Sequence, residues 1–466
     1  MFQSEVRHLK TRRQAIHLYY NQTEKAMKAK FLNLVIVLLM TAGYAVAQQS
    51  NLQYYIPLGQ DRVGKFETNK TDTVEFEGVK VRIGGAFAQQ LQMLSHTNSH
   101  TEAVDNDGAV QINSLYLMNL KKGFNNAVAN FNIDAQLADG VRLELVTYLS
   151  SLHHTEAWVK GGFIQFDKLP FINNAAVESF MDIATIKIGH MEINYGDGHF
   201  RRTDNGNAIT NPFVGNYIMD AFNTEIGAEI YVQTNGLILM GAVTEGEIKG
   251  STAGTNTNSG AAYMFKAGYD NQMNEDLRLR LTGSLYTTYD RANGNNLYSG
   301  DRTGTRYQNV IQDIAGSPDF RAARWNPNFR NKVTSIMINP YVEFNGLEFF
   351  GMYETSSGYR YDNNLAEDAQ ITRTANQLAG ELIYRFGANN NFYVGTRFNK
   401  VYGELEGSDP SDIPSITRKQ FAAGWFLSKN ILAKLEYVDQ KYSDFADPLY
   451  DGARFNGIVF EAVIGF

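Results

Sequence analysis

The chain has 466 residues, of which 43% are hydrophobic and 12% aromatic, so it can form an extensive packed structure and is not a disordered chain. Its formal net charge of −7 argues against nucleic acid as a partner, and we expect none. The absence of cysteine excludes disulfides, thiolate metal sites, a catalytic thiol and the acylated cysteine of a bacterial lipoprotein. Any attachment to a membrane must therefore come from the polypeptide itself.

A secretory signal peptide is predicted over residues 27–47. A basic start is followed by an apolar run over residues 31–40 and by a small-residue exit, Ala45-Val46-Ala47. The alternative is a membrane anchor, which needs roughly twenty apolar residues, and this run is shorter. Residues 1–26 precede a complete signal, so we interpret them as an upstream extension without a function and expect translation to start at Met27.

The chain after the signal peptide alternates apolar and polar residues in repeated segments, which is typical of strands with one apolar face. The clearest segments are 79–87, 127–137, 141–145, 277–285, 421–427 and 431–437. None of the segments reaches the length of a transmembrane helix, and the mean hydropathy is −0.32. A β-barrel has such a mean, because residues that face lipid alternate with residues that face the lumen.

Short turns alternate with long polar connections along the same region. Asp139-Gly140 and the Asn-Gly pairs at 235–236 and 345–346 are hairpin signals. The longest polar connections cover residues 94–110, 196–222, 290–333, 355–374 and 403–417. A barrel with short periplasmic turns and long outer loops has this alternation. A soluble β-sandwich also alternates, but is not expected to sustain the pattern over about 400 residues.

The final residues form one more alternating segment, with Ile458, Phe460, Ala462, Ile464 and Phe466 on one face. A last strand that ends on an aromatic residue resembles the recognition signal of bacterial outer-membrane barrels, which implies the barrel-assembly machinery as a partner. We predict an all-β fold over residues 79–466: a transmembrane, antiparallel, up-and-down β-barrel of about sixteen strands, with fourteen or eighteen as alternatives. The expected location is the cell outer membrane, in contact with its lipid and lipopolysaccharide.

The segment Ile186-Lys187-Ile188-Gly189-His190-Met191-Glu192-Ile193-Asn194-Tyr195-Gly196 leads a strand into a long loop. In this feature and in its barrel pattern the chain resembles outer-membrane porins, more loosely those of the phosphate-selective and related substrate-specific type. That type usually has a Pro-Phe corner where this chain has Tyr195-Gly196-Asp197. The resemblance therefore implies a barrel channel rather than a phosphate preference, and an open porin would often be a homotrimer.

Residues 48–78 are interpreted as a short periplasmic segment, too short for the plug domain of a TonB-dependent transporter. A barrel of this size encloses water unless something fills it. We therefore expect a porin that allows passive diffusion of small hydrophilic solutes or ions, with a preference for anions. The alternative is an adhesin or a partner in an envelope complex, and its lumen would be occluded by its own side chains. A barrel hydrolase is a further alternative.

Arginines are the candidate pore residues, because rings of arginine favour anions and a guanidinium binds phosphate or carboxylate through two hydrogen bonds. Two long loops could fold into the lumen, 196–221 with Arg201 and Arg202, and 290–332 with Arg302, Arg306 and Arg324. The alternative is that these are solvated outer-loop arginines that pair with Asp or with lipopolysaccharide phosphates. In the strands, alternation places on the lumen face Arg82, Arg142, Glu144, Arg278 and Arg280.

We expect no enzymatic activity, no metal site and no cofactor. The chain lacks a Gly-x-Ser-x-Gly elbow, and pairs such as Ser95-His96 are adjacent in sequence only. His153 and His154 would point to opposite faces of a strand, and Asp197 with His199 would supply only two ligands. Several tyrosines are interpreted as an aromatic girdle at the membrane interfaces, with a sugar-stacking track as the alternative: Tyr286, Tyr289, Tyr341, Tyr353, Tyr384 and Tyr437.

Overall fold

The computed structural model describes residues 49–99, 117–149, 157–246, 260–289, 295–300, 306–362, 364–366, 369–405 and 411–466. The predicted signal peptide and upstream extension lie outside these residues. The described strands are β1 (Lys80–Thr97), β2 (Gly123–Phe124), β3 (Val128–Ala138), β4 (Val141–Leu149), β5 (Trp158–Phe166), β6 (Ala184–Glu192), β7 (Thr224–Thr234), β8 (Leu237–Thr244), β9 (Ala262–Gln272), β10 (Leu277–Thr288), β11 (Lys332–Phe344), β12 (Leu347–Tyr359), β13 (Arg373–Phe386), β14 (Phe392–Gly403), β15 (Ser415–Ser428), β16 (Ile431–Ser443) and β17 (Arg454–Gly465). The described helices are α2 (Ala175–Met181) and the short 3₁₀ turns η1 (Gln60–Arg62), η2 (Gly198–Phe200) and η4 (Ala388–Asn390).

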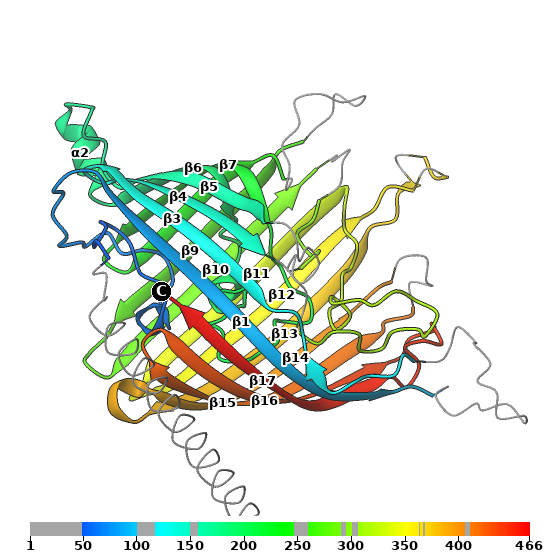
Figure 1. Ribbon diagram of the computed structural model, residues 1–466. Coiled ribbons are helices and arrows are strands. Elements are labelled where there is room, and N and C mark those ends of the chain that lie inside the picture. Colours follow the sequence, from blue (N-terminus) through cyan, green and yellow to red (C-terminus); the bar gives the residue numbers. More distant parts are fainter. Residues whose placement is uncertain are drawn as a thin grey trace, which may run out of the picture. The chain divides into compact units, whose positions relative to one another are not determined.

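The strands form one closed antiparallel sheet, in which each strand from β3 to β16 pairs with the next strand of the chain and β17 pairs with β1 (Figure 1). The two-residue β2 and the longer β3 both pair with β1, one after the other, so they share one position in the wall. The described strands therefore make a barrel of sixteen wall positions, which confirms the predicted fold. None of the helices in the described part of the chain is long and apolar enough to span a bilayer.

The strands expose apolar side chains and bury polar ones. In β16, Leu435 and Tyr437 are exposed on the outer face, whereas Lys434 and Glu436 are completely buried on the lumen side. A water-soluble sheet would have the opposite distribution. Hydrocarbon lipid favours an apolar outer surface and leaves the polar residues to the interior, so the period-two pattern of the sequence decides which residues face the lumen.

The turns at one end of the barrel are short, as predicted. Asn235 and Gly236 have φ of 48° and 83°, and Asn345 and Gly346 have φ of 48° and 78°, the left-handed values of a two-residue hairpin turn. One connection at this end departs from the expectation. Residues 167–183, between β5 and β6, contain the helix α2, whose first turn is capped by Asn174. This segment has no strand alternation, and the sequence pattern did not reveal it.

The last residue closes the seam between β1 and β17. The Phe466 amide donates to the Gly85 carbonyl at 3.0 Å, and the Gly85 amide donates to the Phe466 carbonyl at 3.1 Å. A Cβ on Gly84 would lie 2.8 Å from the Phe466 carbonyl oxygen, so this approach requires glycine. The apolar terminal strand predicted from the sequence therefore has a structural role as the closing strand of the wall.

Aromatic residues on the outer face form part of a girdle. The rings of Tyr384, Phe386, Phe392 and Trp425 stack in a row, with 5.8 Å between successive ring centroids. The predicted girdle residues that are exposed are Tyr289, Tyr353, Tyr384 and Tyr437. The prediction was wrong for Tyr286 and Tyr341, which are buried inside the barrel. Both donate their hydroxyl groups to buried or half-buried carboxylates, Tyr286 to Glu225 and Tyr341 to Glu343.

Candidate functional site

The connection between β6 and β7, residues 193–223, folds into the lumen, and we call it the lumen loop. Its main chain donates to side chains on the far wall, from Val214 to Glu436 of β16 at 2.8 Å and from Ile218 to Asn399 of β14 at 2.7 Å. Towards another part of the wall, the Asn205 side chain donates to the Ala129 carbonyl of β3 at 2.7 Å. The lumen loop therefore crosses the barrel interior.

The connection between β10 and β11 also enters the lumen. Its described residues, 295–300 and 306–331, are called the second loop. Trp325 donates through its amide to Ile218 of the lumen loop at 2.8 Å, and Tyr298 donates to Glu354 of β12 at 2.7 Å. The second loop thus packs on the lumen loop and on the wall. Burial and the neighbouring Arg321 lower the pKa of Arg324 in this loop to about 10.

The N-terminal segment, residues 49–78, also contacts the lumen side of the barrel. Gln53 holds its start, since the Gln53 side chain accepts from the Gly140 amide at 2.8 Å in the β3–β4 turn. The Gln60 amide donates to the Lys429 carbonyl at 2.7 Å in the β15–β16 turn. Further along, Phe66 and Glu67 reach the inner wall of β9 to β11. No local pattern in the sequence predicts that so short a segment would partly fill the lumen, because contacts such as Gln53–Gly140 and Glu67–Lys266 join residues 87 and 199 positions apart.

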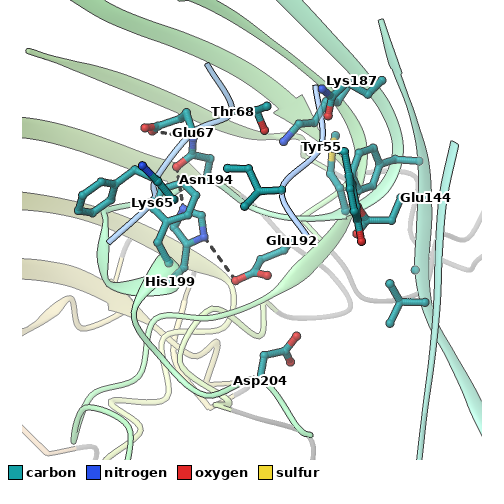
Figure 2. Close-up of a pocket in the computed structure, with 18 of the residues that line it drawn as sticks. Tyr55, Lys65, Glu67, Thr68, Glu144, Lys187, Glu192, Asn194, His199 and Asp204 are labelled. Atoms are coloured by element: carbon teal, nitrogen blue, oxygen red, sulfur yellow. Dashed lines mark hydrogen bonds and ion pairs between the residues drawn. The ribbon is translucent and has the colours of Figure 1, made fainter. Parts of the chain in front are cut away.

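A cavity of about 200 Å³ remains between the N-terminal segment, the lumen loop and the inner wall of β4 to β7 (Figure 2). Its charged lining comprises six cations, which are Arg62, Lys65, Arg142, Lys160, Lys187 and Arg202, and four carboxylates, which are Glu67, Glu144, Glu192 and Asp204. Aromatic rings complete the lining, among them Tyr55, Phe163 and Tyr231. The cavity is therefore polar, charged and open to water-sized molecules, as a solute path requires.

Most cavity charges are paired across short distances. Arg142 lies 3.2 Å from Glu144 and 2.7 Å from Asp134, and Lys160 pairs with Asp204. In Figure 2 the His199 ring bridges two elements, with one nitrogen 2.8 Å from Asn194 and the other 3.4 Å from Glu192.

Two cations of the N-terminal segment differ from the others. Within the described residues, neither Arg62 nor Lys65 has an ion pair. The other four cations of the lining each have an ion pair with a carboxylate in the lining or behind it, so these two side chains account for its positive excess. They are candidate pore residues that were not predicted from the sequence, since residues 48–78 were interpreted as a short periplasmic segment.

The arginines predicted in the lumen loop are buried rather than solvated. Arg201 pairs with Glu381 at 3.0 Å and with Glu348, and Arg202 pairs with Asp220 at 2.6 Å. Burial opposes the charge of Arg201, but the two carboxylates raise its pKa above the ordinary value. The Arg201 contacts hold the loop against β12 and β13, and the Arg202 pair lies within the loop, so the two charges are already balanced.

The other predicted residues are distributed over several sites. Arg82 lies over the Tyr55 ring at 5.6 Å, and Arg306 is buried beside Glu461 at 3.4 Å. Arg324 donates to the Tyr298 carbonyl at 2.8 Å. Arg302 lies outside the described residues. The structure therefore does not bring the ten candidates together as one ring.

Arg278 and Arg280 of β10 lie together with the N-terminal segment. Arg278 pairs with Asp270 at 2.7 Å, and Arg280 pairs with Asp197 of the lumen loop at 2.8 Å. Burial opposes ionisation of Asp197, but Lys266 and Arg280 hold its pKa well below the ordinary value. Asp197 and Lys266 were not predicted as site residues. Alternation along β9 places Lys266 on the lumen face, but the partner that it would meet there is not visible in the sequence.

Residues with possible catalytic chemistry have structural contacts. His96 accepts from the Ile311 amide at 2.8 Å through one ring nitrogen, and its other nitrogen lies 2.6 Å from the Met118 carbonyl. His153 and His154 lie outside the described residues. Among the residues that the structure describes, there is no group of three or more side chains suited to a metal ion.

The comparisons with known proteins find similar folds but no sequence relative. No protein-family model and no curated protein match the chain. The anion-selective porin from Comamonas acidovorans is 10% identical, over 83% of this chain and 100% of that chain, with a TM-score of 0.49. The outer membrane channel DcaP of Acinetobacter baumannii is 10% identical, over 84% and 98%, with a TM-score of 0.48. OmpT, an outer membrane protein of Vibrio cholerae, is 9% identical, over 85% and 100%, with a TM-score of 0.47. At these identities the similarity concerns the barrel fold alone.

Proposed function

We propose that the chain is an outer-membrane porin through which small hydrophilic solutes or ions diffuse passively. The observation that carries this proposal is the charged cavity inside a closed barrel, between the N-terminal segment and the wall of β4 to β7. Its width would be set by the segments that fill the rest of the lumen. A narrow path of this kind favours small solutes and gives a low conductance.

We propose further that the path prefers anions. The predicted arginines of the lumen loop support this less than the sequence suggested, because carboxylates balance their charges. Support comes instead from Arg62 and Lys65 in the cavity lining. Export through a signal peptide, insertion by the barrel-assembly machinery, contact with lipopolysaccharide and a homotrimeric assembly stay predictions, as does the absence of enzymatic activity.

The direct test is single-channel recording. The purified, detergent-folded protein would be inserted into a planar bilayer and its reversal potential measured in a potassium chloride gradient. We expect small, steady conductance steps and a reversal potential closer to the equilibrium potential of chloride than to that of potassium. A folded, heat-modifiable barrel without conductance would contradict the proposed function. A reversal potential closer to the equilibrium potential of potassium would contradict the anion preference.

A second function has an observation in its favour. Three segments occupy the lumen, and an occluded lumen is what an adhesin or an envelope-complex partner predicts. The same recording separates the two functions, because such a barrel would be folded and silent. If neither the wild type nor a variant with a loosened lumen loop conducts ions, the result would favour this second function.

A further inference from the structure

Phe66 of the N-terminal segment lies in a cage of cations and rings on the inner wall. The Arg280 guanidinium is 4.2 Å from the centre of the Phe66 ring, and the Arg278 guanidinium is 5.3 Å from it. Tyr341 and Phe200 meet the same ring edge-on, at 5.2 Å and 5.6 Å. An aromatic ring beside two guanidinium groups is favourable, because the π electrons attract the cations. The cage is therefore built to hold an aromatic ring.

The next residue, Glu67, supplies a carboxylate to the same place. Its oxygens lie 2.8 Å from the Arg280 guanidinium and 3.3 Å from the Lys266 ammonium, and the Asn194 amide donates to it at 3.3 Å. Burial raises the pKa of Glu67, and the charges of Lys266 and Arg280 more than offset this effect, which leaves a pKa of about 2. The carboxylate is thus bound in its charged form.

The cage needs an anion. It holds three cations, Arg278, Arg280 and Lys266, against two carboxylates of its own, Asp197 and Asp270. The side chains of Lys266 and Arg280 are completely buried. Each cation has one of these carboxylates beside it, but an excess of positive charge is unfavourable in a buried site, and the negative charge of Glu67 offsets it.

The cage adjoins the proposed solute path. Phe66 and Glu67 both belong to the lining of the cavity, together with Lys65 and Thr68 on either side of them (Figure 2). The N-terminal segment is fixed separately, at Gln53 and at Gln60. The two side chains therefore enter the cage as a ligand would, from the side on which solutes would pass.

We propose that Phe66 and Glu67 act as an internal ligand in a binding site of the barrel wall, and that this site takes small aromatic carboxylates from the cavity when the two side chains leave. The ring of such a solute replaces the Phe66 ring beside the two guanidinium groups. Its carboxylate replaces that of Glu67 on Lys266 and Arg280. The inference rests on the proposed function for the access route, but its binding step can be measured without conduction.

The test uses the full-length chain with Phe66→Ala and Glu67→Gln, which removes the aromatic ring and the negative charge from the cage. Isothermal titration with 3-phenylpropanoate, in detergent, compares this double variant with the wild type. We expect the double variant to bind at least tenfold more tightly, and uncharged 3-phenylpropanol to bind neither protein measurably. The matched control is Asn69→Ala with Thr73→Ala, which alters exposed positions of the same segment outside the cage and the cavity lining and should bind as the wild type does.

Equal affinity for the double variant and the wild type would overturn the inference, as would equal binding of the alcohol. If the double variant does not fold, Phe66→Leu with Glu67→Gln is a smaller change with the same expected direction. Block of the channel current by 3-phenylpropanoate in the variant would connect the site to the path. Binding without any current in either protein would refute the proposed porin function and leave the binding site standing.

Discussion

The lumen loop offers a sharp test of what limits the channel, through the substitution Arg201→Met. Methionine keeps a long unbranched side chain and removes the guanidinium that contacts Glu381 at 3.0 Å and also contacts Glu348. Arg201 is 3% exposed, so solvent does little to screen the loss. Breaking a buried ion pair by removing one partner costs about 3 to 5 kcal/mol.

The lower end of this range applies, because each carboxylate keeps another cation. Glu381 still has Arg397 at 2.8 Å, and Glu348 still has Arg385 at 3.0 Å. A cost of about 3 kcal/mol changes the equilibrium between the docked and the displaced lumen loop by about a hundredfold. Single-channel records of Arg201→Met should therefore show a wider conductance state, occupied about a hundred times longer than in the wild type.

Two controls separate loop release from a general loss of stability. Arg360→Met removes an exposed arginine beyond the end of β12 and should leave the records unchanged. Arg201→Lys keeps the charge and should restore part of the docking. If Arg201→Met has the same conductance states as the wild type, and protease cleaves its lumen loop no faster, then the ion pairs with Glu348 and Glu381 do not hold the loop.

Three further predictions concern the other parts of the barrel. The pKa of Glu67 is about 2 in the cage, compared with an ordinary value of 4.5, so its contribution to docking is complete above about pH 4.5 and is lost as the pH falls towards 2. Wild-type conductance should therefore rise as the pH falls through that range. A matching rise in Glu67→Gln would exclude Glu67 as the cause. Lys65→Glu reverses a charge in the cavity lining and should move the reversal potential towards the equilibrium potential of potassium. An unchanged reversal potential would show that Lys65 does not line the conduction path. Deletion of Phe466 removes the hydrogen bonds that close the seam with Gly85 and should lower the heat-modifiable, folded fraction on gels; an equal fraction would show that the seam closes without them.

The barrel itself was predictable from the sequence, because its determinants are local. Strand alternation needs only neighbouring residues, and the Asn-Gly turns at 235–236 and 345–346 are two-residue signals. The same alternation predicts Arg142 and Arg280 on the lumen face, and in the structure both are buried among carboxylates. Alternation also explains the error at Tyr286 and Tyr341, since a tyrosine is suited both to an interface girdle and to a buried hydrogen bond.

The site was less predictable, because its partners are distant in the chain. Arg201 and Glu381 are 180 residues apart, and Glu67 and Lys266 are 199 residues apart. A sequence shows that a lumen-facing arginine exists but does not show which carboxylate it meets, and that partner decides whether its charge acts on a solute. The N-terminal segment was missed for a related reason. It has no period-two or helical pattern, and its position depends on side chains of β9 and β10 that meet Phe66 and Glu67 only in the folded barrel.

These contacts change what the number of strands implies about the channel. A sixteen-position barrel with short side chains inside would hold a wide column of water. Here the wall presents buried cations and carboxylates, such as Lys434 and Glu436, whose charges need partners in a low-dielectric interior. The lumen loop supplies some of these partners, because the Lys434 ammonium donates to the Ala208 and Phe213 carbonyls at 2.7 Å and 3.1 Å. Loop and wall thus stabilise each other, and the path that remains is set by this mutual pairing rather than by the diameter of the barrel. Substitutions that remove a wall charge should therefore alter conductance mainly through the position of the loop, even where the residue never meets a solute.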